Sequence, residues 1–150
     1  MTTPEIEPAT PSEVPAIIDC AHAAYAEYVP LIGRKPAPMV ADFAGHVRRS
    51  EIFVARVRGA FAGYIVFFAR DNAMFLENVA VHPDMAGRGI GTALIRFCEW
   101  NAREAGLAQV RLYTNEKMAA PLALYPKLGY REVDRRREDG FNRVYFAKDL

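Results

Sequence analysis

Residues Asp84–Leu94 read DMAGRGIGTAL, in which Gly87, Gly89 and Gly91 alternate with other residues before the chain becomes apolar. Glycines at every second position let the backbone turn tightly and present successive N–H groups to an anion. The amphipathic pattern that follows places the positive end of a helix dipole at the same point. The stretch therefore predicts a phosphate-binding loop between a strand and a helix.

Two familiar phosphate-binding loops do not fit this spacing. A P-loop requires Gly-Lys-Ser/Thr, but Gly91 is followed by Thr92 and Ala93. A dinucleotide-binding GxGxxG loop requires glycine where this chain has Thr92 or Leu94. The loop must belong to another class.

The sequence around the loop predicts one α/β domain over residues 1–150, with a mixed sheet and the order β-α-α-β-β-β-α-β-α-β-β. Thr10, Pro11 and Glu13 predict the start of the first helix, as N-cap, first helical residue and capping-box partner. The expected elements are a strand at Ile6–Ala9, a helix ending near Pro30, a helix at Val40–Ser50, strands at Glu51–Val57, Ala60–Ala69 and Ala73–Val81, a helix at Gly89–Ala105, a strand at Ala108–Thr114, a short helix ending at Gly129, and a hairpin of Tyr130–Glu138 with Phe141–Asp149.

The composition of the chain argues against several classes of function. The chain has 19 Lys and Arg against 18 Asp and Glu, a net charge of +1, so it lacks the basic excess of a nucleic-acid-binding protein. It has no apolar run of about 20 residues to span a membrane and no evident secretory signal. Cys20 and Cys98 stand alone and the three histidines lack metal-ligand spacing, which predicts no metal site, no disulfide framework and a cytoplasmic protein.

Three motifs in order carry a family resemblance: VAVHP (Val79–Pro83), AGRGIG (Ala86–Gly91) and LYPKLGY (Leu124–Tyr130). Together with the final hairpin they resemble the GNAT superfamily of acyl-CoA-dependent N-acyltransferases. The resemblance covers most of the chain and is strongest over residues 76–150. It implies a GNAT-like fold and acetyl-CoA as cosubstrate, with no metal ion.

The resemblance also implies how the cofactor is held. The loop would bind the pyrophosphate of coenzyme A through backbone amides, with the Arg88 guanidinium adding charge; the residues concerned are Gly87, Arg88, Gly89, Ile90, Gly91 and Thr92. Backbone groups of Val79, Ala80 and Val81 would hold the pantetheine arm and acyl thioester, and one N–H would face the developing oxyanion.

Two positions depart from the family pattern. Ala86 stands where the family has Gln or Arg, and Pro121 stands about where an Asn often helps to order the cofactor. Each loses a side-chain contact, so both predict a weaker cofactor site.

The chemistry requires a neutral amine nucleophile and a protonated leaving thiolate. Tyr125 matches the family tyrosine that faces the cofactor sulfur and is the candidate general acid; a core aromatic is the other interpretation. Pro126 follows it and favours a kink there. Glu77 is the candidate general base, or else an exposed or substrate-orienting glutamate. Strand alternation puts Glu77 on one face with Phe75, Val79 and Val81, and Leu76, Asn78 and Ala80 on the other.

Other candidates are weaker. His82 follows the strand in a loop, where a histidine is usually solvated, and Cys98 lies on an apolar helix face, which favours packing over a covalent acyl-enzyme. The acceptor is expected between the first two helices and the last hairpin; possible contacts are Tyr28, Arg34, Lys35, Arg137 and Asn142.

The sequence thus predicts an N-acetyltransferase that acts directly on a primary amine of a small molecule or a protein. A non-catalytic acyl-CoA-binding module of the same fold is the alternative. A nucleotide-binding protein that uses the same loop is a third reading, but it leaves LYPKLGY unexplained. We expect no nucleic-acid or membrane partner, and a homodimer remains open.

Overall fold

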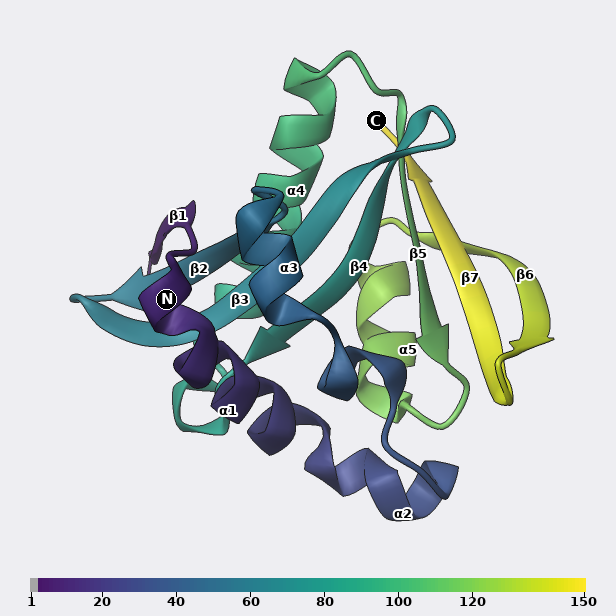
Figure 1. Ribbon diagram of the computed structural model, residues 1–150. Coiled ribbons are helices and arrows are strands. Elements are labelled where there is room, and N and C mark those ends of the chain that lie inside the picture. The colour runs from purple at the N-terminus through teal and green to yellow at the C-terminus, as the bar shows by residue number, and fades with distance from the viewer. Residues whose placement is uncertain (1–2) are drawn as a thin grey trace.

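Seven strands form one mixed sheet in the computed structural model, which describes residues 3–150 (Figure 1). They are β1 (Glu5–Pro8), β2 (Ile52–Val57), β3 (Ala60–Arg70), β4 (Ala73–Val81), β5 (Gln109–Asn115), β6 (Arg131–Glu138) and β7 (Phe141–Asp149). Their order in the sheet is β1-β2-β3-β4-β5-β7-β6. Only β4 and β5 are parallel; every other neighbouring pair is antiparallel. The mixed α/β sheet predicted from the sequence is confirmed.

Helices cover both faces of the sheet. One face carries α1 (Val14–Tyr25), α2 (Val29–Ile32) and α3 (Phe43–Arg48), and the other carries α4 (Ile90–Glu104) and α5 (Ala119–Lys127) (Figure 1). Each face has its own apolar core, one centred on Ile17 and Tyr64 and the other on Leu94 and Leu112. Short 3-10 segments lie at Pro11–Glu13, Ala26–Tyr28, Ala37–Val40 and Pro83–Met85.

The N-terminal helices differ from the prediction in their boundaries. The capping box of Thr10 and Glu13 forms as expected. The predicted helix at 40–50 is wrong in its first turn: Ala41 is extended, and α3 begins only after Asp42, whose carboxylate accepts a hydrogen bond from the Gly45 N–H at 3.1 Å. An aspartate at this position caps a new helix rather than continuing an old one.

A β-bulge interrupts β4. Strand β3 pairs Val66 with Asn78 and Phe67 with Leu76, so Glu77 has no partner across the ladder. One extra residue shifts the two-residue alternation, so the side chains after it lie on the opposite face from the one that an uninterrupted strand would give them. The bulge therefore decides which residues of β4 meet which layer of helices.

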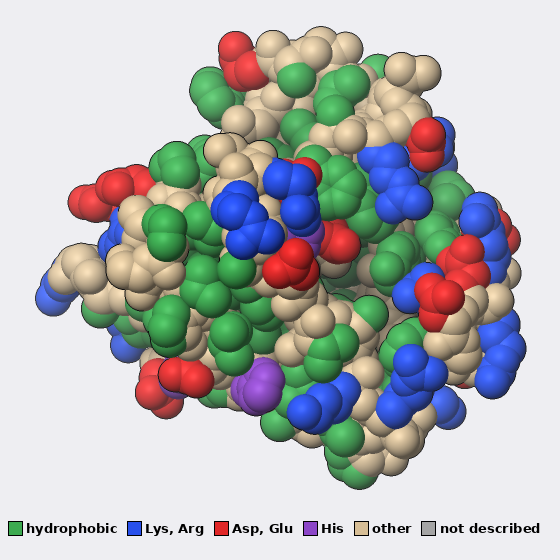
Figure 2. Space-filling model, in the orientation of Figure 1, with side chains coloured by type: hydrophobic (Ala, Val, Ile, Leu, Met, Phe, Trp, Pro, Cys, Tyr) green, Lys and Arg blue, Asp and Glu red, His purple; other side chains and the backbone are tan. Residues whose placement is uncertain are grey.

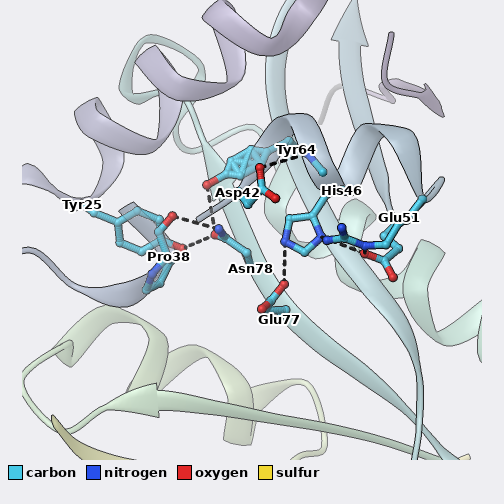
Figure 3. A network of polar contacts seen from close by, with 10 residues as sticks. Tyr25, Pro38, Asp42, His46, Glu51, Tyr64, Glu77 and Asn78 are labelled. Atoms are coloured by element: carbon cyan, nitrogen blue, oxygen red, sulfur yellow. Dashed lines mark hydrogen bonds and ion pairs between the residues drawn. The ribbon is translucent and has the colours of Figure 1, made fainter. Parts of the chain in front are cut away.

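The simple alternation expected for this strand is consequently wrong. Val79 and Val81 pack with Leu76 in the core beneath α4, whereas Ala80 packs in the core beneath α1. Glu77 points toward α3, away from the two valines (Figure 3).

Strands β4 and β5 separate after a short paired stretch. Their ladder contains only Met74 with Val110 and Phe75 with Arg111, and beyond these residues the strands diverge (Figure 1). From Leu76 onward the edge of β4 that faces β5 has no strand partner; within this stretch the Val79 carbonyl accepts a hydrogen bond from the Tyr25 hydroxyl.

Candidate active site

A cavity of about 740 Å³ fills the gap between β4 and β5. Its walls come from both layers: Tyr25 and His46 from the α1–α3 side, and Ile95 and Tyr125 from the α4–α5 side. Figure 2 shows the opening as a hollow with hydrophobic side chains inside and charged side chains around it. The predicted residues Glu77, Val79, Ala80, Val81, Gly91 and Tyr125 all line it.

The glycine loop adjoins this cavity. Gly87 and Gly89 have φ near +78°, which glycine adopts without strain, and α4 starts at Ile90 directly afterwards. Within residues 3–150, no acceptor meets the backbone N–H groups of residues 87 to 92, the six that the sequence singled out. Successive unpaired N–H groups at a helix N-terminus form an anion-binding site.

Arg88 is exposed in this loop, and Ala86 before it is exposed as well. The charge that the loop offers to an anion therefore comes from backbone dipoles and from one exposed guanidinium. That the backbone amides carry most of the contact in this segment stays a prediction.

Glu77 makes a close contact with a histidine that the sequence did not reveal. Its Oε2 lies 2.9 Å from Nε2 of His46, and Nδ1 of the same ring lies 2.9 Å from Oε1 of Glu51 (Figure 3). His46 is on α3 and its side chain is only 8% exposed. The ring stacks on Phe68 at 6.4 Å, which holds its plane.

The carboxyl group of Glu51 responds to these contacts. Partial burial pushes its pKa upward, but hydrogen bonds from His46 and Arg49 outweigh burial and leave the pKa below the usual value. Glu51 therefore stays ionised and favours a proton on the neighbouring imidazole nitrogen.

Tyr125 enters the cavity from α5. Its ring packs against Tyr130 and Phe146 at centroid distances of 5.5 and 5.9 Å, and burial raises its pKa well above that of a free tyrosine. Tyr125 is therefore buried in the core and also lines the cavity, and its role as general acid stays a prediction. Pro126 lies inside α5, as the sequence suggested.

Asn78 ties the cavity wall to three neighbouring segments. Its Oδ1 accepts hydrogen bonds from the hydroxyls of Tyr25 and Tyr64 at 3.1 and 3.0 Å, and its Nδ2 donates to the Pro38 carbonyl at 3.0 Å (Figure 3). Tyr25 is also 2.8 Å from the Val79 carbonyl. This buried network fixes the middle of β4 against α1.

The residues predicted to contact an acceptor separate into two groups. Tyr28 lines the cavity, whereas Arg137 and Asn142 lie outside its lining and contact each other at 3.5 Å. Arg34 reaches across to the β6–β7 turn, where it donates to the Asp139 carbonyl at 3.1 Å and covers the Phe141 ring at 4.0 Å. Lys35 is exposed and does not line the cavity.

Asp42, Arg49 and Arg143 are among the polar residues of the cavity wall that the sequence missed. Arg143 is held over the ring of Tyr113 at 4.3 Å and pairs with Asp139. Each lies in a segment far along the chain from the motifs, so no local spacing could have indicated it.

Two residues that the sequence gave little weight as catalytic groups lie outside the cavity lining. Cys98 is fully buried in the core beneath α4, and His82 accepts a hydrogen bond from the Asp84 N–H beside the loop. Cys20 is also buried and free.

Residues 48–132 match the family model described as the acetyltransferase (GNAT) domain. This stretch contains β4, the glycine loop, α4 and α5, so the chain belongs to the GNAT acetyltransferase family.

Two curated relatives are similar to parts of the chain. Acetyltransferase ECA0875 of Pectobacterium atrosepticum is 33% identical over 96 residues, which is 64% of this chain and 58% of that protein. The ribosomal protein bS18-alanine N-acetyltransferase of Escherichia coli K12 is 37% identical over 62 residues, 41% of this chain and 42% of that protein. The matched stretches thus span less than two thirds of these relatives.

Solved structures share the fold over almost the whole chain. The PaiA N-acetyltransferase of Thermoplasma acidophilum, in complex with coenzyme A, has a TM-score of 0.80 at 15% identity and covers 99% of this chain and 100% of its own. The ribosomal-protein-S18-alanine N-acetyltransferase of Escherichia coli has a TM-score of 0.75 at 22% identity, with 99% and 94% covered. The GNAT-like fold predicted from the sequence is confirmed.

Proposed function

We propose that this protein is an N-acetyltransferase that transfers the acetyl group of acetyl-CoA directly to a primary amine. The observation that carries the proposal is the cavity between β4 and β5, which connects the glycine loop with Glu77 and Tyr125. Family membership and the names of the relatives support the same reaction class.

The chain's own groups fit coenzyme A. The six unpaired N–H groups of residues 87–92 suit a pyrophosphate, and the open edge of β4 at Val79–Val81 suits the amides of the pantetheine arm. Acetyl-CoA supplies the activated thioester when bound. Val79–Val81 orient its carbonyl, and a backbone N–H there stabilises the oxyanion.

Two side chains handle the protons. Glu77 takes a proton from the bound amine, which then forms the new C–N bond to the acetyl carbon. Tyr125 donates its hydroxyl proton to the coenzyme A sulfur as the C–S bond breaks. Because both cysteines are buried and burial raises the pKa of Cys20 to about 12 and that of Cys98 further, neither is a thiolate nucleophile, which supports direct transfer.

Residues 1–150 form one catalytic domain that works in a reducing, cytoplasmic compartment, and the two free buried cysteines support this location. Every helix of the 3–150 region falls short of what crossing a membrane would require. The acceptor amine enters from the side of Tyr28 and Phe141, and it belongs to a small molecule or to a protein.

The first test is a thermal-shift comparison of acetyl-CoA, coenzyme A, ATP and NAD at equal concentration. A ligand present at 100 times its Kd adds about 2.7 kcal/mol, which is several degrees for a domain of this size. We expect stabilisation by acetyl-CoA and coenzyme A only, followed by thiol release with members of an amine panel. Stabilisation without turnover would favour the non-catalytic acyl-CoA-binding module, and stabilisation by ATP or NAD alone would overturn the proposal.

A further inference from the structure

The imidazole of His46 lies between two carboxylates in a buried position. Its two ring nitrogens are each 2.9 Å from a carboxylate oxygen, Nδ1 from Glu51 and Nε2 from Glu77 (Figure 3). Asp42 caps α3 and Phe68 stacks on the ring, so both contacts are held in place. A neighbour on one ring nitrogen fixes what the other nitrogen can do.

The number of protons in this arrangement is informative. A neutral histidine has one ring proton, and the 2.9 Å contact with ionised Glu51 places it on Nδ1; Arg49 Nη2, at 3.4 Å from Nδ1, is more distant. The Nε2 lone pair then faces Oε2 of Glu77. That oxygen is buried and has no hydrogen-bond partner among the described residues, so its 2.9 Å contact with Nε2 is a close approach without a proton between the two atoms. Two acceptors 2.9 Å apart have room for one additional proton.

The surrounding charges are mixed. The titratable or charged groups that face the His46–Glu77 contact from the neighbouring elements are Asp42, Arg49, Glu51, Tyr113 and Arg143. Glu51 is the only one that contacts the ring at less than 3 Å within residues 3–150. Its side chain is 19% exposed, so a proton that reaches it can exchange with water.

Building on the proposed function, we propose that His46 is a positioning residue for Glu77, and that Glu51, His46 and Glu77 form a path along which the amine's proton leaves the cavity. The N–H bond of the substrate ammonium breaks and its proton goes to the Glu77 carboxylate. Glu77 passes a proton to Nε2 of His46, the ring releases its Nδ1 proton to Glu51, and Glu51 releases it to water. The ring ends as the opposite tautomer, with its proton on Nε2. It resets when Nε2 releases this proton to solvent through the cavity and Nδ1 takes up a proton from water through Glu51.

The path works like the carboxylate–imidazole pair of a catalytic triad. Glu51 fixes the proton on Nδ1, and Nε2 is then free to accept a proton from Glu77. The path also gives a role to the bulge. Glu77 is the residue of β4 that has no partner in the β3 ladder, and it is the residue that contacts the buried His46.

The test compares His46→Gln with the wild type, using an amine that the wild type acetylates. Gln is polar and similar in reach but cannot accept and release a proton. We expect kcat to fall at least about 10-fold with KM values for both substrates within about twofold, since general-base steps contribute about 10²–10⁴. The pH profile of kcat/KM should also change, because the side chain at position 46 no longer takes a proton from Glu77. His22→Gln, at an exposed histidine on α1, is the matched control.

A double variant shows whether His46 acts through Glu77 or affects catalysis independently of it. His46→Gln combined with Glu77→Gln should be no slower than Glu77→Gln alone, because the pathway is already interrupted. Full activity of His46→Gln with an unchanged pH profile, or additive losses in the double variant, would overturn the inference while leaving the proposed function intact. A wild-type protein that binds acetyl-CoA but acetylates no amine would overturn both.

The tautomer of the His46 ring can be measured without catalytic turnover. The chain has three histidines, so ¹⁵N spectra of the rings are readily assigned by substitution. We expect neutral His46 to hold its proton on Nδ1, and this preference to be lost in Glu51→Gln. A proton on Nε2 in the neutral wild type would contradict the path.

Discussion

Tyr125 and Glu77 reach one cavity from opposite layers of the protein: Tyr125 from the layer of α4 and α5, and Glu77 from the strand edge that faces α3. The gap between β4 and β5 is what allows two layers that a closed sheet would separate to share a ligand. The proposed acid and base therefore approach a substrate from different sides, as a transfer between two substrates requires.

Tyr125→Phe should lower kcat about 100-fold while thermal stability and acetyl-CoA binding stay close to those of the wild type, because only the hydroxyl is removed. Burial raises the pKa of Tyr125, so the group remains a protonated donor across the usual pH range. Wild-type kcat should show no alkaline decline caused by this residue below about pH 10. A variant with unchanged kcat would remove Tyr125 from the mechanism.

Gly63→Ala should weaken both the fold and the cofactor site. A Cβ at Gly63 would lie 2.5 Å from the Ala80 carbonyl oxygen, so β4 must move where it is proposed to hold the pantetheine arm. Gly91→Ala is the control for the fold, because its Cβ would meet Val81 at 3.5 Å, an ordinary contact. Thermal denaturation with and without acetyl-CoA measures both effects. Equal melting temperatures for the two variants would contradict the prediction.

Lys148→Met should destabilise the protein by about 3 kcal/mol, because removing one partner of a buried ion pair leaves the other uncompensated. Lys148 Nζ lies 3.1 Å from the Glu99 carboxylate, which is buried and also accepts from the Tyr130 hydroxyl at 2.8 Å. Denaturant unfolding measures the loss. Lys127→Met, at an exposed lysine on α5, should change stability by less than about 0.5 kcal/mol.

Glu13→Gln should flatten the loss of stability in acid. Burial alone would raise the pKa of Glu13, but hydrogen bonds from Thr10 and Arg56 dominate and lower it. A carboxyl whose pKa is lower in the folded state adds stability above its unfolded pKa, and this stability disappears as pH falls through the folded pKa. Unfolding measured between about pH 7 and pH 3 tests this. Glu7→Gln, whose side chain is 56% exposed against 17% for Glu13, should leave the slope nearly unchanged.

Cys20 and Cys98 should resist alkylation in the native protein. Burial raises the pKa of Cys20 to about 12 and that of Cys98 higher still, so the thiolate is scarce at pH 8 as well as inaccessible. Labelling followed by mass spectrometry should require unfolding for both thiols. Rapid native labelling of Cys98 would reopen the question of a covalent acyl-enzyme.

The motifs predicted what depends on local sequence. Alternating glycines before an apolar helix fixed the loop and the start of α4, and Asp139–Gly140 marked the β6–β7 turn, where both residues have positive φ. These features form from neighbouring residues, so a short stretch contains all the information needed.

The remaining features depend on distant contacts. Nothing near His46 indicates that it meets Glu77, because α3 and β4 come together only when β2 and β3 have paired between them. The bulge was missed for a related reason: a strand period of two was expected to run through LENVAV without interruption, and only the β3 register shows where it is broken. The neighbouring polar residues Glu77 and Asn78 do not by themselves indicate which of the two lacks a partner.

The extra residue in β4 also has a consequence for changes in chain length. Deleting Glu77 would remove the carboxylate but make the ladder with β3 regular, so that Asn78 stays beside its tyrosine partners and Val79 and Val81 stay in the core beneath α4. A lost codon at this point of β4 should therefore harm the fold less than a lost codon at Asn78 or Val79, which would exchange the faces of the residues beside it.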